Sequence, residues 1–138
     1  MTSARDPASM MAAGAAILAR ELSPAGFTFQ LTGRGSSSGG NFAAGRFTRG
    51  DQYLEIHFRY SLGLVTYGWG NSQLSHADYL AGLGQAGAYP GYGADPLDGF
   101  RHLAQDLAGP LSGFRDGDRG GYERSLQAAK QPRRRTLP

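Results

Sequence analysis

The sequence predicts an α+β domain, in which an N-terminal helix precedes a four-stranded antiparallel meander and two or three helices pack on one face of its sheet. Two observations support this class. Apolar and polar residues alternate with a period of two between residues 27 and 69, which is typical of strands with one buried face. Apolar residues recur at helical spacing before and after that segment. We expect residues 1–130 to form one domain and residues 131–138 to form a basic, disordered tail.

The N-terminal helix is predicted by its end signals and by one apolar face. Asp6 and Pro7 supply a cap and a first-turn proline, and Pro24 and Gly26 end the helix. The face that it buries consists of Met11, Ala15, Leu18 and Leu22. The segment matches a signal peptide poorly, because an acidic residue lies where positive charge is required. We therefore expect a cytoplasmic protein.

The meander is predicted to contain four strands, at residues 27–32, 42–49, 52–60 and 64–69. The first strand should bury Phe27, Phe29 and Leu31. The Gly- and Ser-rich residues 33–41 are interpreted as a flexible loop. The last two strands are expected to form a hairpin in which Tyr67 lies beside Ile56 on the core face.

Two or three helices are expected in the second half of the chain. The first follows Ser75, which forms a capping box with Asp78. The second begins with Asp95 and Pro96 as cap and first-turn proline, and a Gly-Pro pair ends it. A short final helix covers residues 122–130, and Phe114 is expected as an isolated apolar anchor before it.

The composition excludes several classes of protein. The 138 residues include no Cys, which rules out disulfides, thiolate metal sites and cysteine nucleophiles. No apolar run reaches the roughly 18–20 residues that a membrane span needs. The net charge of +3 arises at the C-terminus, because four of the 14 Lys and Arg lie in the last nine residues. The other ten Lys and Arg are balanced by the 11 Asp and Glu of the chain. A nucleic acid is therefore not an expected partner.

The strongest candidate site lies on the strand at residues 52–60, where Glu55, His57 and Arg59 alternate and point away from the core. An acid, an imidazole and a guanidinium about 7 Å apart can transfer a proton or bind an anion. They can equally form a solvated polar face whose charges pair across the strands. Since an outward sheet face implies no cleft, partner recognition is favoured over catalysis.

A loop at residues 88–94 offers a second candidate, because it carries Tyr89 and Tyr92 beside Gly and Pro. These tyrosines either form a binding surface or fold back to complete a core poor in Val and Ile. The other histidines, His76 and His102, are expected at the surface, and His102 has an acidic partner, Asp106, one helical turn away. Neither histidine has the spacing of a metal site. No catalytic residue, metal ligand or cofactor is predicted.

Four segments within residues 27–108 share a pattern with a known class of proteins: LEIHFRYSLGLV at 54–65, LSHADY at 74–79, YPG at 89–91 and DPLDGF at 95–100. In this pattern the chain resembles small immunity proteins of bacterial polymorphic toxin systems. The resemblance implies a non-enzymatic, cytoplasmic protein that binds and neutralises one cognate toxin domain, without a cofactor or a membrane partner. We expect such a protein to be a monomer or a weak dimer.

Two other classes fit the same order of elements. A small ligand-binding domain or enzyme would have its site where the loops meet the helices, and a chaperone for a secreted effector would usually dimerise. Within the immunity class, a nuclease target is not favoured by electrostatics. Inhibitors of nuclease toxins are often strongly acidic, whereas residues 1–129 carry a net charge of only −1, from ten basic and 11 acidic groups.

Overall fold

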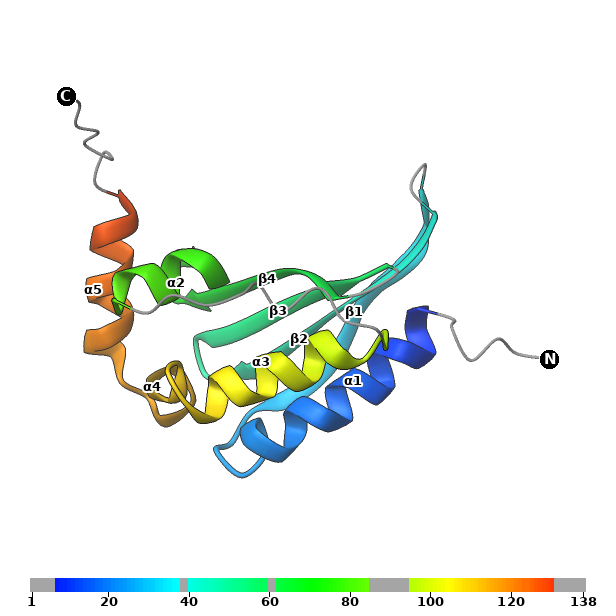
Figure 1. Cartoon of the computed structure of the whole chain (residues 1–138), viewed down its shortest axis with the longest axis horizontal. Helices are drawn as coiled ribbons and strands as arrows, with labels where there is room; N and C mark the ends of the chain where they lie inside the picture. Colours follow the sequence, from blue (N-terminus) through cyan, green and yellow to red (C-terminus); the bar gives the residue numbers. More distant parts are fainter. Residues whose placement is uncertain (1–6, 38–39, 60–61, 85–94, 131–138) are drawn as a thin grey trace.

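A five-stranded antiparallel sheet forms the centre of the molecule, and helices precede and follow it (Figure 1). The computed structural model describes residues 7–37, 40–59, 62–84 and 95–130. The described elements, in chain order, are α1 (Pro7–Leu22), β1 (Thr28–Ser37), β2 (Gly40–Arg49), β3 (Gln52–Phe58), β4 (Leu62–Trp69), β5 (Ser72–Ser75), α2 (His76–Gly82), α3 (Asp98–Ala108), α4 (Ser112–Asp116) and α5 (Arg119–Lys130). The predicted α+β class is confirmed, with five strands in place of four.

Helix α1 buries the face that the sequence predicts, since its four apolar residues at helical spacing all belong to the core. It packs against α3, and the two helices lie side by side along the sheet (Figure 1). Their close approach depends on Gly14, where a Cβ would lie 2.5 Å from the Phe100 ring. The short α2 and the last helix, α5, pack on each other and on the β4–β5 end of the sheet.

The strands pair in chain order from β1 to β5, and every pair is antiparallel. The predicted pairing of Tyr67 with Ile56 is wrong by two residues, because Ile56 pairs with Val65. The cause is a β-bulge, in which Gly63 and Leu64 of β4 lie opposite the single β3 residue between Ile56 and Phe58. The faces are nevertheless as predicted, since a shift of two residues preserves the face of a strand.

The Gly- and Ser-rich segment interpreted as a loop is mostly strand. β1 continues to Ser37 and β2 begins at Gly40, so the two strands form one long hairpin that extends beyond the helices (Figure 1, cyan). Composition misled the prediction because the hydrogen bonds of an antiparallel pair join backbone groups, whatever the side chains. Leu31, expected in the core, is 41% exposed. It lies in an edge strand, at a register shift between Leu31 and Gly33.

The strand β5 is not predicted from the sequence, because its four residues include one apolar side chain, Leu74. Ser75 caps α2 as predicted, and its hydroxyl accepts a hydrogen bond from the backbone N–H of Asp78. The next helix begins at Asp98, after a turn in which Asp95 accepts from a backbone N–H, and so starts later than predicted. The last helix, α5, starts earlier than predicted.

Phe114 lies at the centre of an aromatic cluster, although the sequence predicts an isolated anchor. Its ring centroid lies between 4.9 and 6.2 Å from those of Phe27, Tyr67, Trp69 and Tyr79. These rings come from the residue before β1, from β4 and from α2. The cluster therefore joins the C-terminal helices to the sheet and supplies the apolar volume that few Val and Ile provide.

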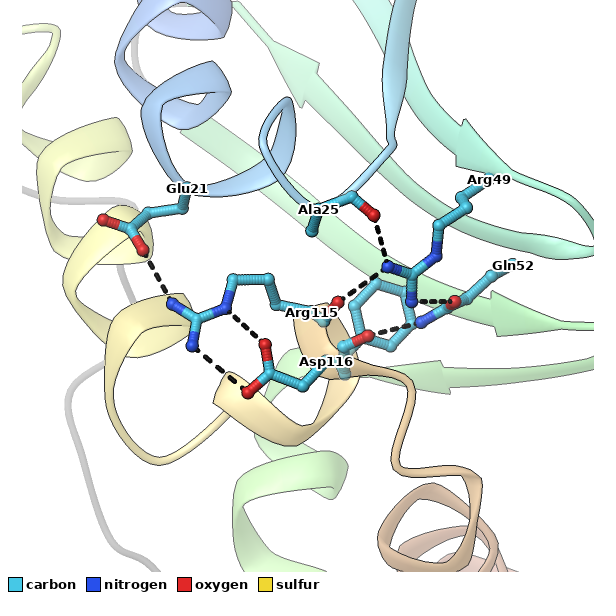
Figure 2. Close-up of polar contacts among 7 residues, drawn as sticks. Glu21, Ala25, Arg49, Gln52, Arg115 and Asp116 are labelled. Carbon is cyan, nitrogen blue, oxygen red and sulfur yellow. Dashed lines mark hydrogen bonds and ion pairs between the residues drawn. The ribbon is translucent and has the colours of Figure 1, made fainter.

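Arg49 and Gln52, at the turn between β2 and β3, form a polar bridge to two distant segments (Figure 2). The Nη1 of Arg49 donates to the carbonyls of Ala25 and Arg115, at 2.6 and 2.9 Å. Its Nη2 donates to the Gln52 side chain, whose amide donates in turn to the carbonyl of Phe114. These bonds tie the α1–β1 turn, the β2–β3 turn and α4 together.

Candidate functional site

The outer sheet face consists of the strand side chains that point away from the core. α1 packs on the opposite face, where the alternate residues of β3 are buried. The partly exposed residues of β3 define the outer face, and the register aligns the other strands with them. It comprises Thr28, Gln30, Phe42, Ala44, Arg46, Thr48, Tyr53, Glu55, His57, Arg59, Leu64, Thr66, Gly68, Gln73 and Ser75.

Glu55 is the centre of a row of charged and aromatic side chains on this face. Its carboxylate accepts a hydrogen bond from the Arg46 guanidinium and lies 3.2 Å from Nε2 of His57. The guanidinium carbon of Arg46 also lies 4.1 Å from the centroid of the Tyr53 ring. Burial raises the pKa of Glu55, but hydrogen bonds from Arg46 and His57 outweigh it and bring the pKa below its usual value. Glu55 is therefore ionised at neutral pH and holds both basic side chains in place.

Tyr53 lies across the neighbouring strand, where Gly68 leaves room for its ring. A Cβ at Gly68 would lie 2.1 Å from the ring carbons of Tyr53. The hydroxyl of Tyr53 accepts a hydrogen bond from the side-chain amide of Gln73, at 2.6 Å. The outer sheet face thus presents an aromatic ring that contacts on three strands hold in position.

Replacing Gly68 with Ala is expected to displace this ring and to lower the free energy of unfolding by about 1 kcal/mol, the lower end of overpacking costs, since the side chain of Tyr53 can move aside. Urea denaturation measures the cost, and the ring signals of Tyr53 in NMR spectra report the displacement. Thr66→Ala, at the neighbouring outer position of β4, is the matched control and should leave these signals in place. Unmoved Tyr53 signals in Gly68→Ala would contradict the packing of the ring on Gly68.

The β-bulge between β3 and β4 forms a pocket at one end of the outer sheet face. It directs Leu64 outward, so that this side chain is 67% exposed. The pocket has a volume of about 240 Å³ and is lined by Phe42, His57, Phe58, Arg59, Gly63 and Leu64. The guanidinium carbon of Arg59 lies 5.7 Å from the Phe42 ring centroid. Alternation along the strand does not predict this pocket, because the pocket depends on the bulge.

The structure brings the three predicted strand residues into two overlapping groups. Glu55 and His57 are in contact, and His57 and Arg59 line the same pocket. The other two predicted residues, Tyr89 and Tyr92, lie outside the described residues.

Sequence reasoning missed the cross-strand members of the site. Arg46 pairs with Glu55, and Phe42 and Leu64 approach the same pocket from β2 and β4. The alternation along residues 42–49 places Arg46 on the polar face, which is a usable signal. Its partner on β3 follows only from the register, and the register depends on where the turn and the bulge lie.

His76 is buried, contrary to the expected surface position, and is 1% exposed. As the first residue of α2, it lies between β4 and α3, with Nδ1 2.8 Å from the Tyr67 hydroxyl and Nε2 2.9 Å from Asp106. Burial lowers the pKa of His76, and its interactions with Asp106 offset only part of this shift. The neutral ring therefore donates from Nε2 to Asp106 and accepts from Tyr67 at Nδ1.

The predicted pair of His102 with Asp106 is present at 3.7 Å, so the two histidines share one carboxylate. Because Tyr67 and His76 are sealed from solvent, we assign this group to the stability of the core. Among the described residues, no three His, Asp or Glu side chains lie close enough together to hold a metal ion. None of the described helices has both the length and the apolar character that crossing a membrane requires.

Comparison of the chain with family models, with curated proteins and with solved structures found no match.

Proposed function

We propose that this chain is a non-enzymatic, cytoplasmic immunity protein, which neutralises a cognate toxin domain by binding it on the outer sheet face. The resemblance of four sequence segments to immunity proteins supports the class. The observation that carries the proposal is the ordered row of Arg46, Tyr53, Glu55 and His57 on a sheet face that α1 leaves open.

This row has the properties of a recognition surface. Arg and Tyr are enriched among the residues that contribute most to binding between proteins. The side chains already contact one another, so binding fixes few additional rotamers and loses little conformational entropy. Tyr53, Glu55 and His57 are partly exposed and so remain accessible to a partner.

Co-expression with the products of the neighbouring genes tests the proposal. A stable one-to-one complex with the C-terminal domain of a large secreted protein, seen by pull-down and size-exclusion chromatography, is the expected result. Elution of the chain alone or as a self-dimer in the presence of every neighbouring product would contradict it.

Reversing single charges on the outer sheet face tests whether this face is the interface with the partner. Glu55→Lys releases Arg46 and His57 from their positions, and Arg59→Glu reverses a positive charge of the face. Each variant should weaken the complex by more than about 1 kcal/mol, as expected for residues inside a protein interface. Isothermal titration calorimetry with the co-purified partner measures the change. Glu123→Lys and Arg124→Glu reverse the same charges at exposed positions of α5 and should bind like the unchanged protein.

The two variants differ in what they do to the fold. Glu55→Lys brings a second positive charge next to Arg46, so the free energy of unfolding of this variant is measured in parallel. Arg59→Glu, one residue beyond β3, decides the matter: a complex as tight as that of the α5 controls would exclude this face as the interface.

A further inference from the structure

The pocket at the β3–β4 bulge has two chemically different sides. Arg59 and His57 supply a guanidinium and an imidazole, and Phe42 and Leu64 supply an aromatic ring and a largely exposed aliphatic side chain. A guanidinium recognises a carboxylate with two parallel hydrogen bonds, and an exposed leucine gains from apolar contact. The lining therefore matches a ligand that joins a negative charge to an apolar group.

The charge of the outer sheet face also favours a negative ligand. Among the described residues of this face, Glu55 is the one carboxylate, and it is already engaged by Arg46 and His57. Arg46 and Arg59 leave the face with a formal net charge of +1 when the histidine is neutral, from two positive and one negative groups. Acidic groups on a partner therefore find complementary charge here, and basic groups do not.

The size of the pocket restricts the ligand further. Sites for small molecules and cofactors usually measure about 300–1,000 Å³. A volume of about 240 Å³ is smaller than this range and holds one or two amino-acid side chains.

We propose that this pocket binds an acidic side chain, together with an adjacent apolar side chain, of the protein that docks on the outer sheet face. The inference rests on the proposed function for the nature of the partner, and it adds the chemistry of one contact. The carboxylate lies against Arg59 and His57, and the apolar side chain lies against Phe42 and Leu64. The proposal predicts a toxin domain that presents an acidic surface.

An NMR titration of the full chain tests the proposal with two probes, acetyl-Leu-Glu-amide and acetyl-Leu-Gln-amide, which differ in the charge of one side chain. The acidic probe should shift the signals of Phe42, His57 and Leu64 and should bind at least about threefold more tightly, the ratio expected of one half-exposed ion pair. Equal affinity of the two probes, shifts confined to other residues, or the absence of shifts would overturn the proposal.

Variants with matched controls assign the two sides of the pocket. Arg59→Gln should remove the preference for the acidic probe, and Leu64→Ser should lower the affinity for both probes. Two control variants lie away from the pocket: Arg124→Gln on α5 and Leu31→Ser at an exposed position of β1. Both should preserve the affinities for the two probes. Loss of the preference in Arg124→Gln as well would mean that net charge, and not the pocket, selects the probe.

The two proposals fail in different ways. If Arg59→Gln and Leu64→Ser both bind a neighbouring gene product as tightly as the unchanged protein does, the proposed role of the pocket is wrong and the immunity function is retained. Binding of the acidic probe in the pocket, without a complex with any neighbouring product, would retain the pocket chemistry and overturn the immunity function.

Discussion

Phe114→Ala is expected to lower the free energy of unfolding by about 3–5 kcal/mol, which is the usual cost of removing a buried aromatic ring. Phe114 is fully buried and contacts four other rings, which belong to β4, to α2 and to the residue before β1. Its removal leaves a cavity among these neighbouring rings. Because natural domains have a total stability of about 5–15 kcal/mol, the variant should lie close to its unfolding threshold at room temperature.

Urea denaturation of the unchanged protein, of Phe114→Ala and of Phe114→Leu measures this effect. Phe114→Leu keeps most of the apolar volume and should lose much less stability than the alanine variant. Leu64→Ala, at an exposed position, should change the stability by less than about 0.5 kcal/mol. A loss below about 1 kcal/mol in Phe114→Ala, with an unchanged denaturant slope, would contradict a central position for this ring.

His76→Leu should lower the free energy of unfolding by about 2–3 kcal/mol at neutral pH, because it removes the hydrogen bonds of the imidazole to the Tyr67 hydroxyl and to the Asp106 carboxylate. Both groups are largely buried, so water replaces the lost hydrogen bonds poorly. The leucine side chain has a volume close to that of the imidazole, which separates the loss of hydrogen bonds from the creation of a cavity.

The same residue gives a dependence of stability on pH. The pKa of His76 in the folded protein lies below its usual value of 6.5, so the unfolded chain binds more protons between the two values. The free energy of unfolding should therefore fall as the pH is lowered from 7 through 6.5 toward the folded pKa, and this loss should stop below it. The difference between the unchanged protein and His76→Leu should narrow over the same range.

Denaturation at a series of pH values from 8 to 5 measures this difference. His102→Gln is the matched control, since it removes a histidine beside the same carboxylate but leaves His76 buried, and it should retain the pH dependence. If the free energy of unfolding of His76→Leu changed with pH as much as that of the unchanged protein, the pH dependence would belong to another titrating group.

The sequence predicts best those features that depend on local periodicity. Met11 and Leu18 fall on one face of α1, and Glu55 and His57 fall on one face of β3, because helices and strands repeat every 3.6 and 2 residues. Ser75 caps α2 as predicted, because a cap requires neighbours only three residues away.

The features that the sequence does not predict depend on distant parts of the chain. The burial of His76 follows from Asp106, thirty residues later, whose helix covers it. The contact of Arg46 with Glu55 and the pocket beside Leu64 depend on a strand register that a bulge shifts. No local pattern in the sequence indicates these pairings. The length of the β1–β2 hairpin is a separate case, because its Gly- and Ser-rich composition is typical of a loop.

The polar bridge of Arg49 has a consequence for the order in which the molecule assembles. The meander pairs strands that are neighbours along the chain, so its hairpins close short loops and can form early. The bond from Arg49 to Ala25 spans 24 residues, and the bond to Arg115 spans 66 residues and forms only after α4 has reached the sheet. One guanidinium thus couples the β2–β3 turn to the docking of α4, and a fluctuation that detaches α4 loosens this turn with it.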